Sequence, residues 1–131
     1  MSELVTVKHY GVDDLGEERL RLIVDSVVRA MPTDAIVIFG SFARGEATDD
    51  SDVDILVLSP LRGIELRNRS VEAESRMWDL DKRTDFLAYN TGDFAQMINS
   101  GWSFASNVVR DGVCVYGQFE QARELRRDRR G

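Results

Sequence analysis

Two short apolar segments separated by a polar loop constrain the fold of this chain most. Residues 35–39 read AIVIF and residues 53–58 read VDILVL, and each is long enough for one strand. Runs that are apolar at nearly every position are typical of strands covered on both faces rather than on one. Helical patterns come before and after them, so the sequence predicts an α/β fold in which helices pack on a short sheet.

Two acidic residues lead into the second segment: Asp52 directly precedes it and Asp54 is its second residue. Because side chains alternate across a strand, both carboxylates point to the same face, about 6–7 Å apart along the chain. Two carboxylates at that distance cannot both stay ionised in a partly buried site without a compensating cation. Magnesium fits, since it prefers oxygen ligands and keeps positions open for water and phosphates. The alternative is a solvated acidic loop, because Glu46, Asp49 and Asp50 precede the pair.

The loop between the two segments begins with Gly40 and Ser41 and continues into a short helical stretch. Glycine lets the backbone approach a phosphate closely, and Ser41 is expected to cap the helix, whose first N–H groups attract anions. Arg44 is expected either to reach a triphosphate or to pair with Glu46, and Ser51 either to fix the loop or to touch the ligand. Phosphate on the Gly-Ser side and metal on the aspartate side indicate a site for a nucleoside triphosphate.

The rest of the chain predicts helices and two further strands around this centre. Apolar residues at helical spacing predict an amphipathic helix over residues 13–31, capped by Asp13 or Asp14 and stopped by Pro32. Trp102 is expected to pack in the core, and so is Cys114. The other expected elements are a helix with a narrow buried stripe at 65–80, a strand at 83–89, helices at 93–99 and 102–110, and an edge strand at 113–116.

The spacing of Gly40-Ser41, ten residues and then Asp52-x-Asp54 resembles the signature of the DNA polymerase β-type nucleotidyltransferases. GSFARG followed by SDVDILV resembles their small bacterial branch, the minimal nucleotidyltransferases. The resemblance implies a polymerase β-like nucleotidyltransferase fold with a short mixed sheet, two Mg²⁺ ions and ATP as co-substrate. In that family a third acid on a neighbouring strand completes the metal site, and Asp85 is the candidate here unless it is a strand-edge acid facing water. The expected catalytic and metal-binding residues are Asp52, Asp54 and Asp85, and the expected nucleotide-binding residues are Gly40, Ser41, Arg44 and Ser51.

Minimal nucleotidyltransferases are often antitoxins paired with a HEPN-domain ribonuclease toxin, onto which they transfer AMP. The resemblance therefore implies transfer of a nucleoside monophosphate to a hydroxyl of a protein acceptor, such as a tyrosine of a HEPN-type toxin. Two alternatives remain open. One is a non-catalytic nucleotide-binding antitoxin that masks its partner, and the other is a small-molecule enzyme of the aminoglycoside-modifying type. A homo-oligomer or a hetero-oligomer is compatible with each of these.

Length and charge set the remaining bounds. With 131 residues, the chain is expected to form a single minimal nucleotidyltransferase domain over 1–131, with an arginine-rich tail from about residue 118. The net charge of −6 argues against nucleic acid as a direct substrate. No apolar stretch approaches the length of a membrane span, so no membrane contact is expected and the cytoplasm is the expected location. The tail arginines are expected to form either a solvated helix face or a contact surface for a partner.

Overall fold

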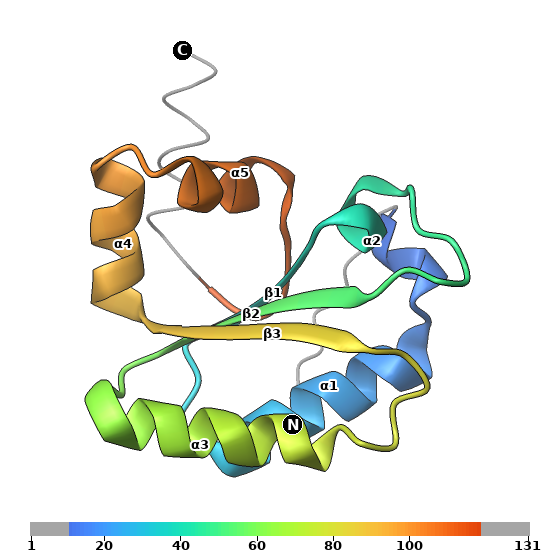
Figure 1. The fold of residues 1–131 in the computed structure, drawn as a ribbon, viewed down its shortest axis with the longest axis horizontal. Coiled ribbons are helices and arrows are strands. Elements are labelled where there is room, and N and C mark those ends of the chain that lie inside the picture. The colour runs from blue at the N-terminus through green and yellow to red at the C-terminus, as the bar shows by residue number, and fades with distance from the viewer. Residues whose placement is uncertain (1–10, 119–131) are drawn as a thin grey trace.

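A computed structural model describes residues 11–118, which form a four-stranded sheet with helices on both faces (Figure 1). Residues 1–10 and the expected arginine-rich tail beyond residue 118 lie outside the described residues. In chain order, the elements are η1 (Gly11–Asp14), α1 (Glu17–Ala30), β1 (Ala35–Phe39), α2 (Ser41–Arg44), β2 (Val53–Ser59), α3 (Gly63–Arg76), β3 (Thr84–Asn90), α4 (Thr91–Asn99), α5 (Ser103–Asp111) and β4 (Val113–Gly117).

The strands lie in the order β3-β2-β1-β4. β1 is antiparallel to both β2 and β4, whereas β2 and β3 are parallel and are joined through α3. The expected short mixed sheet is therefore confirmed, and β4 is an edge strand as predicted. β3 forms the other edge, so one side of this strand has no partner strand in the described part of the chain.

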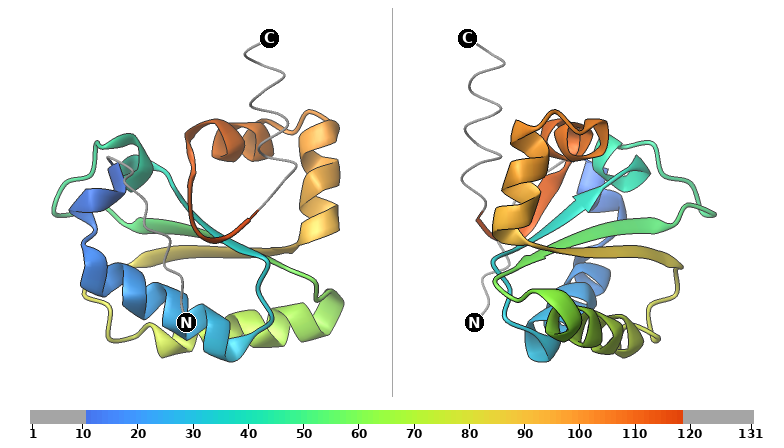
Figure 2. Two further views of the ribbon diagram at one scale, coloured as in Figure 1. Left: turned by 180° about the vertical axis from the view of Figure 1, so that it is seen from behind. Right: turned by 60° about the vertical axis from the view of Figure 1, so that its left-hand side comes forward.

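Both faces of β1 are buried, as its continuous apolar sequence predicts. Ile36 and Ile38 pack in a core with α1 and α3, whereas Ala35 and Val37 pack in a second core with α4 and α5. Figures 1 and 2 show these two helix pairs as separate layers on opposite sides of the sheet. Full burial of each large apolar side chain stabilises the fold by about 1.5–3 kcal/mol, so the central strands anchor both layers.

The predicted helix over residues 13–31 begins later than its apolar pattern suggests. Asp13 and Asp14 lie in the short 3-10 helix η1, and α1 starts only after Gly16, which has φ 88° and ψ 152°. Gly16 is therefore the N-cap residue, and the prediction that Asp13 or Asp14 caps this helix is wrong. The physical reason is that glycine accepts a backbone conformation that breaks the helical path. The stop before Pro32 is confirmed, because α1 ends at Ala30.

Helix α3 buries a narrow stripe, as expected for its many charged residues. Ala73 is its fully buried residue, and Met77 follows the helix into the core. The predicted core position of Trp102 is wrong: its side chain is 59% exposed, because the residue precedes α5 as its N-cap and does not take part in its buried face. Cys114 is only half-buried in the edge strand β4. Among residues 11–118, no helix combines the length and the apolar character needed to cross a bilayer.

Candidate active site

The sheet brings two of the three predicted carboxylates side by side. Val53 and Ile55 point into the core beneath β2, so Asp54 between them faces the opposite side, on which α4 and α5 pack. In the parallel pairing of β2 with β3, Asp54 is in register with Asp85. Neighbouring residues of paired strands share a face, so both acids face the same side of the sheet. Asp85 therefore lies beside Asp54, but it is exposed on the edge strand β3 and is not among the residues that line the cleft described below, so its role in the site stays a prediction.

Gly40 packs directly against the Asp54 carboxylate. β1 ends beside β2 with Phe39 in register with Asp54, and the chain then turns at Gly40 with φ 74° and ψ −150°. A Cβ atom at this position would overlap Oδ2 of Asp54. The structure thus gives a reason for glycine that the sequence did not: the residue makes room for the aspartate as well as for the turn. The expected contact of Gly40 with phosphate stays a prediction.

The Asp54 carboxyl has an unfavourable environment for its charged form. Burial raises its pKa above the ordinary value, and the negative charges of Asp85 and Asp52 raise it further. The Arg44 guanidinium acts in the opposite direction but does not cancel these effects. A bound cation would relieve both the repulsion and the poor solvation, so the pair of Asp54 and Asp85 has the charge and oxygen ligands that suit a divalent metal.

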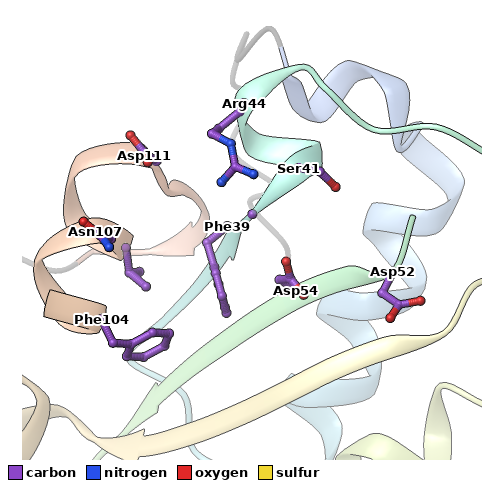
Figure 3. Close-up of a pocket in the computed structure, with 10 residues that line it drawn as sticks. Phe39, Ser41, Arg44, Asp52, Asp54, Phe104, Asn107 and Asp111 are labelled. Carbon is purple, nitrogen blue, oxygen red and sulfur yellow. The ribbon is translucent and has the colours of Figure 1, made fainter. Parts of the chain in front are cut away.

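Asp52 lies apart from that pair. It precedes β2, and its Oδ1 is 3.4 Å from Nε of Arg83, in an ion pair whose side chains are 47% and 86% exposed. Figure 3 shows the Asp54 carboxylate directed toward α2, whereas the carboxylate of Asp52 points away from that helix. Within residues 11–118, no three acidic, histidine or cysteine side chains are gathered as a ready-made metal site. The ion pair with Arg83 is exposed, and a pair of this kind holds Asp52 with at most about 1 kcal/mol, so it restrains the Asp52 carboxylate only weakly.

The expected nucleotide-binding residues occupy four different positions at α2 and in the loop that follows it. Gly40 is the N-cap of α2 and Ser41 its first residue, with no capping hydrogen bond from the serine side chain, so the prediction that Ser41 caps this helix is wrong. Arg44 lines the cleft and donates from Nε to Oε1 of Glu46 at 3.0 Å, so the pairing with Glu46 is confirmed, whereas a contact with a triphosphate stays a prediction. Oγ of Ser51 accepts from the backbone N–H of Thr48 at 2.8 Å, which confirms its role in fixing the loop. A contact of Ser51 with a ligand stays a prediction.

A cleft of about 450 Å³ opens in front of Asp54 (Figure 3). One wall comes from the predicted motif and includes Gly40, Ser41, Arg44 and both Asp52 and Asp54. The other wall consists of Phe39 and of residues from α5 that the sequence reasoning did not assign to a site. These α5 residues are Phe104, Asn107, Val108 and Asp111.

The α5 wall combines an aromatic surface with polar groups. The rings of Phe104 and Phe39 meet edge to face, with centroids 5.7 Å apart and an interplanar angle of 80°. Nη2 of Arg110 donates to Oδ1 of Asn107 at 2.9 Å, and Nε of the same arginine lies 3.3 Å from Oδ1 of Asp111. The spacing F-x-x-N-V-x-x-D places these residues on one side of a helix. This spacing is the sequence feature from which these cleft residues could have been predicted. It does not reveal, however, which part of the fold that side of the helix faces.

Comparison with known proteins places this chain in a family. The sequence model of the nucleotidyltransferase domain matches residues 20–108. The chain belongs to the nucleotidyltransferase domain family. A relative from Methanocaldococcus jannaschii, named "Putative protein adenylyltransferase", is 27% identical over 93 residues, which cover 62% of this chain and 76% of that protein.

Two solved structures show the same fold as this nucleotidyltransferase. One is a crystal structure of a "toxin-antitoxin with AMP-PNP", with a TM-score of 0.53, 22% identity and coverage of 79% of this chain and 77% of that chain. The other is a mutant of the "toxin-antitoxin MntA-HpeT", with a TM-score of 0.50, 19% identity and the same coverage of both chains. The expected polymerase β-like fold is confirmed, with the mixed sheet packed by helices on both faces.

Proposed function

We propose that this protein is a magnesium-dependent adenylyltransferase that moves AMP from ATP to a hydroxyl group of a partner protein. In this proposal the partner is a HEPN-type toxin, the transfer silences it, and the reaction takes place in the cytoplasm. The family supports nucleotide transfer, and the similarity to a protein named as a protein adenylyltransferase supports a protein acceptor. The toxin–antitoxin structures that share the fold, one of them with AMP-PNP, support the partner class and the nucleotide.

One observation carries the proposal: Asp54 lies in register with Asp85, packs against Gly40 and faces a cleft large enough for a nucleotide. An acidic residue with no function at the end of a strand could direct its carboxylate to solvent. It would then not require a neighbouring glycine whose missing Cβ leaves room for the carboxylate. The raised pKa of Asp54 also fits a group whose charge is to be balanced by a ligand rather than by the protein. Arg44 provides a positive charge in the cleft for an anionic triphosphate.

The reaction follows from these placements. Bound Mg²⁺ would neutralise the triphosphate and lower the pKa of the attacking hydroxyl. In the proposed step, the acceptor oxygen forms a bond to the α-phosphorus and the bond to pyrophosphate breaks. Asp85 would receive the proton of the acceptor hydroxyl, Asp52 and Asp54 would hold the metal, and Arg44 would contact the phosphates. Positioning and charge stabilisation supply most of the acceleration in such a transfer, so few other side chains are needed.

The two ends of the cleft suit the two ends of a nucleotide. The triphosphate lies near Asp54 and Ser41 in this proposal, and the base extends toward the aromatic wall of Phe39 and Phe104. A base that stacks on an aromatic ring gains about 1–3 kcal/mol without discriminating strongly among bases. The choice of adenine therefore rests on the AMP-PNP of the structural relative rather than on this wall.

The test is intact-mass spectrometry of the toxin partner after incubation with this protein, ATP and Mg²⁺. We expect a mass gain of one or more AMP units, which the Asp52→Ala/Asp54→Ala variant fails to produce. The matched control is Asp49→Ala/Asp50→Ala, which removes two acids of the same loop that do not line the cleft and should leave transfer unchanged. Transfer by the Asp52/Asp54 variant at the native rate would refute the assignment of the site.

A second candidate is an antitoxin that masks its partner without transferring a nucleotide. The observation in its favour is the ion pair of Asp52 with Arg83, which leaves the three acids ungathered. This hypothesis predicts that the Asp52→Ala/Asp54→Ala variant still silences the toxin in a ribonuclease assay, with no mass gain on the partner. Loss of silencing in that variant, with the complex still formed, would instead favour the adenylyltransferase.

A further inference from the structure

Three polar side chains at the end of α5 form a hydrogen-bonded cluster at the border of the cleft. Nη2 of Arg110 donates to Oδ1 of Asn107 at 2.9 Å and to Oδ2 of Asp111 at 3.5 Å. Nε of the same arginine lies 3.3 Å from the other carboxylate oxygen of Asp111. Asn107 and Asp111 line the cleft, whereas Arg110 is not among the lining residues. One arginine therefore holds two cleft residues without occupying the cleft itself.

The contact with Arg110 fixes which end of the Asn107 amide is free. A guanidinium group only donates hydrogen bonds, so the amide atom that it meets must be the oxygen. The amide nitrogen then forms the other arm of the side chain and carries two N–H groups. Within residues 11–118, no group accepts a hydrogen bond from this nitrogen. Asn107 therefore offers hydrogen-bond donors to a molecule in the cleft.

Asp111 offers the opposite kind of group. Its side chain is 30% exposed, and in the part of the chain that the structure describes its carboxylate contacts the side chain of Arg110 alone. A carboxylate can accept about four hydrogen bonds, so positions remain open on its oxygens. A negative charge in this place repels phosphates and attracts a ligand group that donates. Donors and acceptors thus lie one helical turn apart on the same wall of the cleft.

The position of the pair indicates which part of a nucleotide it meets. Phe104, Asn107 and Asp111 follow one another at intervals of three and four residues, so each lies about one turn, or about 5 Å, from the next. Figure 3 shows Asn107 and Asp111 on the α5 wall, with Ser41 and Asp54 on the other side of the cleft. A nucleotide with its base on Phe104 and its phosphates near Asp54 has its sugar between these two ends.

We propose that Asn107 and Asp111 bind the ribose of the nucleotide, so that the protein selects ribonucleoside triphosphates over 2′-deoxyribonucleoside triphosphates. Asp111 accepts a hydrogen bond from the 2′-hydroxyl, and Nδ2 of Asn107 donates to a ribose hydroxyl oxygen. Arg110 is a positioning residue that holds both side chains in place. This inference rests on the proposed function, since it requires that the cleft binds a nucleoside triphosphate.

The chemistry of the pair favours the sugar over the other parts of the nucleotide. The phosphates carry no donor for Asp111 and share its negative charge, and the base is bound through its face by stacking on Phe104 in the proposed complex. The ribose hydroxyls both donate and accept, which matches a carboxylate beside an amide N–H group. A site built to bind a hydroxyl rejects the analogue that lacks it, because its own polar groups are then left unpaired.

The first test is isothermal titration calorimetry of the full chain with Mg²⁺ and ATP, 2′-deoxy-ATP or GTP. We expect the native protein to bind ATP about 10- to 100-fold more tightly than 2′-deoxy-ATP, as expected when a hydrogen bond to a charged group is lost. Asn107→Ala and Asp111→Ala should each lower this ratio at least threefold, and the double variant should bring it close to one. None of these changes should alter the ratio of ATP to GTP affinity.

The matched control is Asp93→Ala in the first turn of α4. Asp93 is also an acid paired with an arginine, since its Oδ1 lies 3.1 Å from Nη1 of Arg62, but it does not line the cleft. Its replacement should leave the ratio of ATP to 2′-deoxy-ATP affinity unchanged. Circular dichroism and thermal melting verify that all variants fold.

The second test concerns the positioning role of Arg110. Arg110→Met keeps an unbranched side chain but removes the donors that hold Asn107 and Asp111. We expect weaker binding of ATP with little change for 2′-deoxy-ATP, so that the ratio falls. A role of Arg110 in helix stability alone would lower the melting temperature and leave this ratio as it is in the native protein, which would exclude the positioning role.

The outcomes separate this inference from the proposed function. If the native protein binds ATP and 2′-deoxy-ATP equally well, or if neither alanine variant changes the ratio, the ribose assignment is overturned and the nucleotide site stands. If the variants change the preference between ATP and GTP instead, the pair contacts the base, and the ribose assignment is again overturned. A native protein that binds none of the three nucleotides would overturn both proposals.

Discussion

Replacing Gly40 by alanine tests whether this glycine is there to accommodate the carboxylate of Asp54. Gly40 has φ 74° and ψ −150°, a region that residues with a Cβ atom rarely occupy, and an added Cβ would overlap Oδ2 of Asp54. Two costs therefore combine. Holding alanine in this backbone conformation costs about 1–3 kcal/mol, and the forced displacement of the carboxylate costs about another 1–3 kcal/mol.

Gly16→Ala is a control that carries only the first cost. Gly16 has φ 88° and ψ 152°, in the same region of backbone conformation, and an added Cβ would meet nothing within 4 Å. We expect Gly40→Ala to lower the free energy of unfolding by about 4 kcal/mol and Gly16→Ala by about half as much. In thermal melts, the difference between the two variants corresponds to roughly 5–10 °C in Tm for a chain of this size.

A double-mutant cycle separates the contact from the strain. In Gly40→Ala/Asp54→Ala the overlapping carboxylate is absent, and only Cβ of residue 54 remains near the added methyl group, at 3.3 Å. We expect the double variant to be more stable than the sum of the single changes by about 1–3 kcal/mol, measured by urea denaturation. Additive effects, or a Gly40→Ala variant as stable as Gly16→Ala, would refute the reasoning that Gly40 makes room for Asp54.

Three further predictions concern the cleft. Because the pKa of Asp54 is raised, this carboxyl stabilises the fold below its ordinary pKa of 3.8, and that contribution is lost as the pH rises through the folded pKa. In EDTA, the free energy of unfolding of Asp54→Asn, measured by urea denaturation, should therefore rise relative to that of the native protein as the pH increases from 4 to 7. A difference between the two proteins that does not change with pH would contradict this prediction. In the presence of Mg²⁺, ATP at about 100 times its Kd should raise the free energy of unfolding of the native protein by about 2.7 kcal/mol. The increase should be much smaller for Asp54→Asn at the same ATP concentration. Phe104→Ala should raise KM for ATP roughly tenfold with little change in kcat, Phe104→Tyr should restore it, and an unchanged KM would exclude stacking on this ring.

Much of the candidate site was predictable because its signals are local in the sequence. The continuous apolar residues of 35–39 predict a strand buried on both faces, which the structure confirms. Strand alternation places Asp54 correctly on the cleft side of β2, but it does not apply to Asp52, which lies before the strand and pairs with Arg83. Gly40 and Ser41 mark the turn between the two strands. Each of these inferences depends only on residues a few positions apart, whose geometry the backbone fixes without knowledge of the rest of the fold.

One missed feature depends on a contact between distant segments, and two depend on where a helix begins. Asp52 and Arg83 are thirty-one positions apart, and nothing in either segment shows that the loop before β3 brings them together. The apolar spacing continues through Gly16 and therefore predicts a helix that starts at residue 13. The backbone conformation of this glycine ends the helical path, so α1 starts only after it. The predicted helix over residues 102–110 directs Trp102 to the core, but α5 begins only at Ser103, and the position of Trp102 before it leaves the residue exposed.

The sequence by itself determined the strands, the turn and two of the acids, because strand alternation and glycine turns are properties of short segments. Only the tertiary structure decided that β3 pairs parallel to β2 with Asp85 beside Asp54, since register is a choice among long-range pairings. It also decided that Phe104, Asn107 and Asp111 form the second wall of the cleft. A helix carries its stripe in its sequence, but packing against the sheet determines what that stripe faces.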